Sequence, residues 1–200
     1  MIPILILAAA YLAGGIPFGY LIVKLKSGVD VRRMGSGNIG ATNVLRTTGW
    51  VLGVITLLLD IAKGFFAVWL ADRLTAGSPV WMSAAALAVM AGHSFSPYLR
   101  FRGGKAVATF VGAFAYLTPL PLAAVLIVFV LTVAATRYIS LGSVLAAGSF
   151  PLGVFLIEHP PLAVLAAAFL AGFFIVWRHR SNLQRIRAGN ENVFQLSGKR

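Results

Sequence analysis

Long apolar runs alternate with short polar segments along the whole chain. The seven runs are residues 2–23, 51–71, 80–91, 106–118, 122–136, 139–157 and 162–177. Their apolar residues are consecutive and do not alternate with polar ones, which disfavours a β-barrel. The longer runs have the length of a helix that crosses a hydrocarbon core of about 30 Å. The pattern therefore predicts an all-α integral membrane protein in which seven transmembrane helices form a single domain, residues 1–200.

The composition also favours a membrane protein over a soluble one. Of the 200 residues, 59% are hydrophobic and 11% are charged, whereas soluble domains carry about 25% charged residues. A net charge of +12 would suggest nucleic acid in a soluble protein. Here the basic residues lie between apolar runs, so we expect no nucleic-acid partner. The chain contains no cysteine, which excludes disulfides and thiol chemistry.

The basic residues lie mainly on alternate connections between the runs. Of the 17 lysines and arginines, five lie in residues 24–50, three in 92–105 and six in 178–200, with Arg137 on the same side. One lysine lies inside a run, and only Arg73 falls on the opposite side. Because positive residues mark cytoplasmic loops, this bias predicts an N-terminus outside, a cytoplasmic C-terminus and three cytoplasmic segments.

Two of the runs contain helix-breaking or shortening signals. The first run carries Gly14, Gly15 and Pro17, which we expect to kink its helix. It has no basic start, so it is unlike a secretory signal peptide. The fourth run, residues 106–118, is short for a span and suggests a partly re-entrant segment. Such backbone is tolerated at membrane depth only where it lines protein or a water-filled cavity.

The second run contains two charged residues, Asp60 and Lys63, three positions apart and therefore on one helical face. Charges at this depth usually face the protein interior and pair with each other. A structural ion pair is the favoured interpretation, and a direct catalytic role is the alternative.

The segment between the first two runs contains GSGNIGATNVLR, residues 35–46, which has three glycines and no carboxylate. Glycine-rich turns can point successive backbone N–H groups at one anion. Hydroxyl and amide side chains add donors, and the arginine suits phosphate. We interpret this stretch as a segment that binds a phosphate-bearing substrate. The alternative is a flexible linker between two spans.

The second cytoplasmic segment contains RFRGGK, in which Gly103 and Gly104 precede a lysine, Lys105, expected to open a helix. A helix N-terminus with a lysine favours an anion. The GxxxxGK[ST] spacing of nucleotide-binding loops is missing, so ATP hydrolysis is not indicated. The alternative is a set of basic side chains that snorkel at a helix end.

Histidines and carboxylates limit the chemistry that this face can carry. His93 and His179 lie at inner helix ends, where a hydrogen-bonded interfacial role competes with catalysis, whereas His159 lies in an outer turn. None has a neighbour at metal-ligand spacing, so we expect no metal. Of the five acids, only Asp30 and Glu191 lie on the inner side. The site therefore resembles an anion-binding one, whose general base is a histidine or a group on the substrate.

Three groups of residues stand out on the inner side: GSGNIGATN at 35–43, Gly92-His93 with RGGK at 102–105, and RHRSN at 178–182 followed by Gly189 and Glu191. Together they resemble the three cytoplasmic motifs of the bacterial membrane acyl-phosphate:glycerol-3-phosphate acyltransferases. The segments IPFGY, residues 16–20, and LDIAKG, residues 59–64, are similar to that family as well. The motifs come in the same order as in the family, and the resemblance covers nearly the whole chain. Two departures are Gly15 in place of serine and Ala106 in place of glycine.

The resemblance implies transfer of an acyl chain from acyl phosphate to the 1-hydroxyl of glycerol 3-phosphate, with the active site at the cytoplasmic face of the bacterial inner membrane. The partners are then acyl phosphate, glycerol 3-phosphate and the lipid bilayer, with no cofactor, and the chain is expected to be a monomer. The residues expected to be catalytic are Ser36, Arg46, Lys105, His179 and Asn182. Those expected to bind substrate are Asn38, Thr42, Asn43, His93, Gly103, Gly104 and Ser143. By the same resemblance, Glu191 has a structural role beside a basic residue.

Two other functions compete with this interpretation. Acyltransferases that use acyl-CoA through an HxxxxD motif are disfavoured, because Tyr98, Val164 and Gln184 stand five positions after the three histidines. A transporter for organic phosphates would suit broken helices and a cationic inner mouth. The outer face has almost no polar counterpart, which argues against it.

Overall fold

The structure, a computed structural model, describes residues 2–194, so the end of the predicted cytoplasmic tail lies outside the described part. Within that range every regular element is helical, as the apolar runs predicted. The chain divides into two compact units, Met1–Leu117 and Thr118–Arg200. We call them unit 1 and unit 2.

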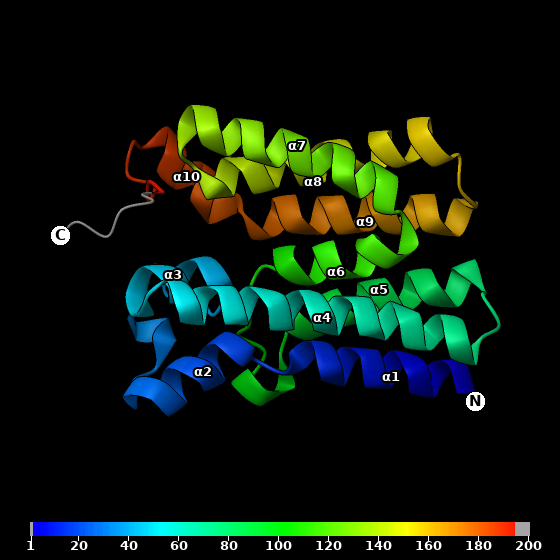
Figure 1. The fold of residues 1–200 in the computed structure, drawn as a ribbon, viewed down its shortest axis with the longest axis horizontal. Helices are drawn as coiled ribbons and strands as arrows, with labels where there is room; N and C mark the ends of the chain where they lie inside the picture. The colour runs from blue at the N-terminus through cyan, green and yellow to red at the C-terminus, as the bar shows by residue number, and fades with distance from the viewer. Residues whose placement is uncertain (1, 195–200) are drawn as a thin grey trace. The chain divides into compact units, whose positions relative to one another are not determined.

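Unit 1 is built around a long helix, α4, that packs against α6 and also contacts α1 and α5 (Figure 1). Its α-helices are α1 (Ile2–Gly15), α2 (Phe18–Ser27), α3 (Ala41–Thr48), α4 (Trp50–Leu74), α5 (Pro79–Ser94) and α6 (Val107–Leu117). Two 3-10 helices, η1 (Val31–Arg33) and η2 (Pro97–Leu99), lie in the connections. The helices α2 and α3 lie at the end of the unit opposite the N-terminus.

The predicted kink in the first span is confirmed. Helix α1 ends at Gly15 and α2 begins at Phe18, so the helix is interrupted next to Pro17. Proline has no backbone N–H to donate to a helical hydrogen bond. Gly14 has a second role, because a Cβ there would overlap the backbone of Val89 on α5. The small residue lets α1 and α5 approach closely.

A small apolar core joins the first two basic segments, residues 24–50 and 92–105. Its buried members are Val23, Val31, Ile39, Val44 and Leu99. The first four belong to α2, η1, the glycine-rich stretch and α3, and the last belongs to η2. The two segments are therefore packed together at one end of unit 1, as expected for parts of one site.

Unit 2 consists of α7 (Pro119–Thr136), α8 (Ile139–Glu158), α9 (Leu162–Arg178) and the short α10 (Arg180–Arg187). Helix α8 packs against α7 and α9 (Figure 1). Residues 119–121 lie between two of the predicted runs, but Pro119 and Pro121 are part of the first turn of α7, where a missing N–H costs no helical hydrogen bond. At the other end of α7, the Phe194 amide donates to the Arg137 carbonyl at 2.8 Å.

Four stretches of the described chain are long and apolar enough to cross a membrane: Pro3–Ser27, which contains the break between α1 and α2, and the helices α4, α7 and α8. A fifth is added when α9 and α10, which meet at a bend of 49°, are taken as one span. Helices α5 and α6 are shorter, with 16 and 11 residues. All seven predicted runs agree with helices to within a few residues, and the fourth is short as expected, but only four or five stretches of the described chain are long and apolar enough for a span by themselves, against the seven spans predicted.

Candidate active site

The glycine-rich stretch is held in shape by one buried side chain, Asn43. Its Nδ2 donates to the carbonyls of Asn38 at 2.8 Å, Met34 at 3.1 Å and Val31 at 3.3 Å. Its Oδ1 accepts the Ser36 amide at 2.8 Å. The sequence predicted that Asn43 contacts substrate, but in the structure its amide is engaged by the loop itself. Asn43 therefore organises residues 31–38 and leaves Ser36 exposed at their surface.

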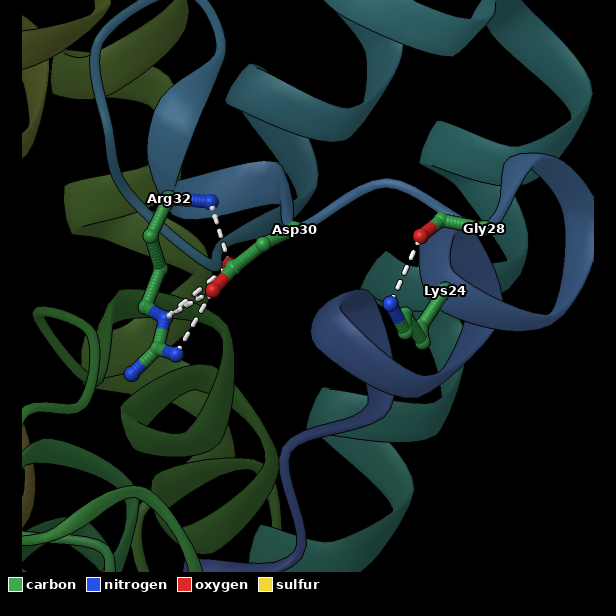
Figure 2. Close-up of polar contacts among 4 residues, drawn as sticks. All are labelled: Lys24, Gly28, Asp30 and Arg32. Carbon is green, nitrogen blue, oxygen red and sulfur yellow. Dashed lines mark hydrogen bonds and ion pairs between the residues drawn. The ribbon is translucent and has the colours of Figure 1, made fainter.

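The start of this loop is fixed by Asp30, which caps η1. Figure 2 shows its carboxylate accepting from the Arg32 amide at 2.9 Å and from the Arg32 guanidinium, with Nη2–Oδ2 at 2.7 Å. Lys24 Nζ donates to the Gly28 carbonyl in the preceding turn. The Arg32 hydrogen bonds outweigh burial and hold the pKa of Asp30 at about 2, below its usual 3.8. Asp30 and Arg32 thus neutralise each other and shape the loop.

The second half of the glycine-rich stretch is helical, which corrects the expectation of a loop. Thr42 and Arg46 lie one turn apart on α3 and are both half-buried. Asn38 precedes the helix, and its Oδ1 accepts the Gly40 amide at 2.9 Å. The stretch is therefore a folded turn and helix, which disfavours the flexible-linker alternative.

Removing the Asn43 side chain tests this scaffold role. Asn43→Ala is expected to lower the free energy of unfolding by about 2–4 kcal/mol, because several backbone groups lose their partner together. The measurement is thermal unfolding of the purified protein in detergent. Asn38→Ala, which removes the single bond to Gly40, is the matched control and should cost about 1 kcal/mol or less. An unchanged unfolding temperature for Asn43→Ala would contradict the scaffold role.

The turn that carries Lys105 rests on His93. The amides of Gly103 and Gly104 donate to the Ser94 and His93 carbonyls, each at 3.1 Å. A Cβ on Gly104 would overlap the His93 ring, and one on Gly103 would overlap the His93 carbonyl. From the sequence we expected Gly103 and Gly104 to bind substrate, but in the structure their amides donate to main-chain carbonyls. The two glycines are explained by close packing.

Lys105 does not open a helix, which corrects a second expectation. Helix α6 begins at Val107, and Ala106 has φ 61°. One residue with left-handed backbone therefore separates Lys105 from the first residue of α6.

The ion pair predicted between Asp60 and Lys63 is present, with Nζ–Oδ1 at 2.7 Å and both side chains buried. His93 joins it, since His93 Nδ1 lies 3.6 Å from the same carboxylate oxygen. Sequence reasoning missed this third member. His93 lies 33 positions after Asp60, and no local spacing links the two.

In unit 2 the tail folds back so that Glu191 is surrounded by donors. Its Oε1 accepts from Asn182 Nδ2 at 2.7 Å and from Ser140 Oγ at 2.9 Å, and its Oε2 accepts from Arg185 Nε at 2.7 Å. Burial raises the pKa of Glu191, but these hydrogen bonds outweigh it and hold that pKa below its usual 4.5. Glu191 is therefore an ionised anchor that orients Asn182. The predicted basic partner is Arg185, and Ser140 was missed.

The other two predicted residues of unit 2 have well-defined geometry. His179 is buried at the junction of α9 and α10, with Nδ1 2.7 Å from the Ile175 carbonyl. Because a carbonyl only accepts, Nδ1 carries the hydrogen, and in the neutral ring Nε2 is the basic nitrogen. Ser143 is buried on α8, and its hydroxyl donates to the Ile139 carbonyl at 2.9 Å.

Apolar helices joined by basic segments, with a buried histidine at the end of one helix, are typical of a membrane protein that binds anions. The family model "Glycerol-3-phosphate acyltransferase" matches residues 4–189. The chain therefore belongs to the glycerol-3-phosphate acyltransferase family, and it is an integral, multi-pass membrane protein.

Similar proteins cover almost the full length. A glycerol-3-phosphate acyltransferase of Desulforamulus reducens is 45% identical over 98% of this chain and 96% of its own. One of Geobacter sulfurreducens is 46% identical over 96% and 97%. The crystal structure of PlsY (YgiH) in its glycerol 3-phosphate form has a TM-score of 0.92 at 37% identity, covering 98% of this chain and 96% of that one. Its lysophosphatidic acid form has a TM-score of 0.89 at 36% identity.

Proposed function

We propose that this chain transfers an acyl group from acyl phosphate to the 1-hydroxyl of glycerol 3-phosphate at the cytoplasmic face of the bacterial inner membrane. The observation that carries the proposal is the full-length match to a PlsY structure in its glycerol 3-phosphate form. A second PlsY structure in a lysophosphatidic acid form supports lysophosphatidic acid as the product. Inorganic phosphate is the other product.

The proposed topology has seven spans in one membrane domain. Helices α1 and α2 together form the first span, and α4, α5, α6, α7, α8 and α9 form the others. The N-terminus is outside, and segments 24–50, 92–105 and 178–200 are cytoplasmic. The distribution of lysine and arginine supports this orientation. In unit 1, the cytoplasmic end is the one that holds α2, α3 and the turn at Lys105.

In the proposed site the cations of unit 1 bind phosphate. Arg46 on α3 offers a two-pronged contact, and Lys105 offers a point charge on a turn fixed by its backbone. Ser36, Asn38 and Thr42 add hydrogen-bond donors for the phosphates or for the oxyanion that develops at the acyl carbonyl. Both substrates carry phosphate, so a site with this many cations and few acids suits them.

The reaction needs one proton transfer and no protein nucleophile. The 1-hydroxyl oxygen attacks the acyl carbonyl carbon, the bond between that carbon and the phosphate oxygen breaks, and inorganic phosphate leaves. His179 Nε2 takes the hydroxyl proton, with a substrate phosphate oxygen as the alternative acceptor. Asn182 positions the glycerol, and Glu191 holds its amide in one orientation through the 2.7 Å hydrogen bond. The mixed anhydride is already activated, which lessens the need for a strong nucleophile on the protein.

A donor comparison tests this function. Purified protein in detergent is offered glycerol 3-phosphate with acyl phosphate, acyl-CoA or acyl-carrier protein in parallel. Lysophosphatidic acid and equimolar phosphate are expected from acyl phosphate alone. Equal turnover of acyl-CoA would contradict the proposed donor. Phosphate flux into liposomes without turnover of any donor would indicate a transporter instead.

A further inference from the structure

The ion pair of Asp60 and Lys63 is buried in the middle of an apolar helix. The side chains are 2% and 5% exposed. Taking two charges out of water costs several kcal/mol for each ion, and apolar residues of similar volume are often as stable in their place. Stability alone is therefore a weak reason for this pair. Ionisable residues at such depth are usually tied to function.

The pair connects three parts of unit 1. Lys63 Nζ donates to the Ile16 carbonyl at 3.0 Å, in the break between α1 and α2. The Asp60 carboxylate faces His93 Nδ1 at the end of α5. One ion pair on α4 is therefore in contact with both the helix break and the His93 ring.

The opposite edge of the His93 ring supports the turn that carries Lys105. A Cβ on Gly104 would overlap His93 Nε2, so ring and turn are in direct contact. The hydrogen bond from the Gly104 amide to the His93 carbonyl, at 3.1 Å, joins the same two residues through the backbone. A tilt of the ring would therefore displace the residue just before Lys105.

We propose that Asp60 and Lys63 act through His93 as positioning residues for the turn of Gly103, Gly104 and Lys105. The inference rests on the proposed function, because it takes Lys105 as a phosphate contact. His93 then serves as the support of the turn, with Asp60 setting its tilt. A shift of the order of 1 Å at a binding group can cost about 10²-fold, so loss of this support is expected to be measurable in substrate use.

The double variant Asp60→Asn/Lys63→Met separates positioning from stability. Asp60→Asn alone leaves a buried lysine unpaired and should lower the unfolding temperature. The double variant removes both charges and should recover most of that loss. Its KM should nevertheless stay at least about 10-fold raised for the substrate whose KM Lys105→Ala raises, with kcat changed less. A double variant that regains both the unfolding temperature and the KM of the parent would overturn the proposal.

A mutant cycle that combines His93→Gln with the double variant tests whether Asp60 and Lys63 act through His93. His93→Gln should raise the same KM, and it should add little in the double-variant background. Fully additive effects would overturn the proposal.

If the double variant does not fold, the test uses Gly104→Ala, because its added Cβ displaces the His93 ring while the ion pair stays. An unchanged KM for Gly104→Ala would also overturn the proposal. Ser83→Ala, which removes another buried polar group of α5, is the matched control. Failure of the proposed function would instead appear as no turnover of acyl phosphate by the parent protein.

Discussion

Replacing His179 with asparagine is expected to lower kcat by about 10²- to 10⁴-fold, the usual contribution of a positioned general base. Asparagine keeps a donor near the position of Nδ1, so the contact with the Ile175 carbonyl can survive. The substitution removes Nε2, the nitrogen that is basic in the neutral ring. The measurement is steady-state turnover of acyl phosphate and glycerol 3-phosphate, together with thermal unfolding to verify the fold.

The matched control is His159→Asn, the same substitution at an exposed histidine at the other end of α8 and α9. It should leave kcat within about twofold, because surface substitutions away from special features are usually small in effect. A kcat for His179→Asn within about threefold of the parent would contradict His179 as the base. The proton would then be assigned to a phosphate oxygen of the substrate.

The helices could be predicted from sequence because a membrane leaves the backbone few alternatives. An apolar run in lipid must satisfy its own N–H and C=O groups, and a helix does so within one segment. Pro17 predicted the break between α1 and α2 for the same reason, since it cannot complete the ladder. The boundaries in the polar segments were harder. Helix α3 was missed because its threonines and asparagine are weak helix formers; in the structure it packs into the apolar core through Val44.

The backbone at Ala106 shows a second limit of sequence reasoning. Its φ of 61° is the left-handed conformation that glycine adopts most easily. Alanine gives no local signal for it, so α6 was expected to begin at Lys105. The glycine that the family pattern has at this position would fit the same conformation without strain.

The candidate site was predicted at the level of segments but less well at the level of roles. Residue types identified the donors, and the apolar core of Ile39 and Leu99 confirms that two of the segments pack together. Residue type alone does not distinguish the residues that hold the loop in shape from those that bind substrate. Asn43 and Ser36 are both polar and seven positions apart, yet one is buried and accepts from the other. Such differences depend on tertiary contacts, which a single sequence does not specify.

Replacing Lys105 with alanine is expected to raise the KM for glycerol 3-phosphate or for acyl phosphate by about 10- to 100-fold. A hydrogen bond to a charged group contributes about 1.5–3 kcal/mol, and each 1.4 kcal/mol is tenfold in binding. The unfolding temperature should change little, because Lys105 is half-buried on a turn that His93 supports through the backbone. Initial rates over a matrix of both substrates identify which phosphate the lysine binds.

Lys26→Ala is the matched control for this charge change. Lys26 is exposed near the end of α2 in the same unit, so its loss changes the net charge equally without touching the turn. Salt screens the field of an exposed surface charge, so both KM values should stay within about twofold. If Lys105→Arg recovers most of the affinity, a cation at this position is what the substrate needs. Unchanged kinetics in folded Lys105→Ala would reject the phosphate contact and, with it, the role of the turn that Asp60, Lys63 and His93 hold in place.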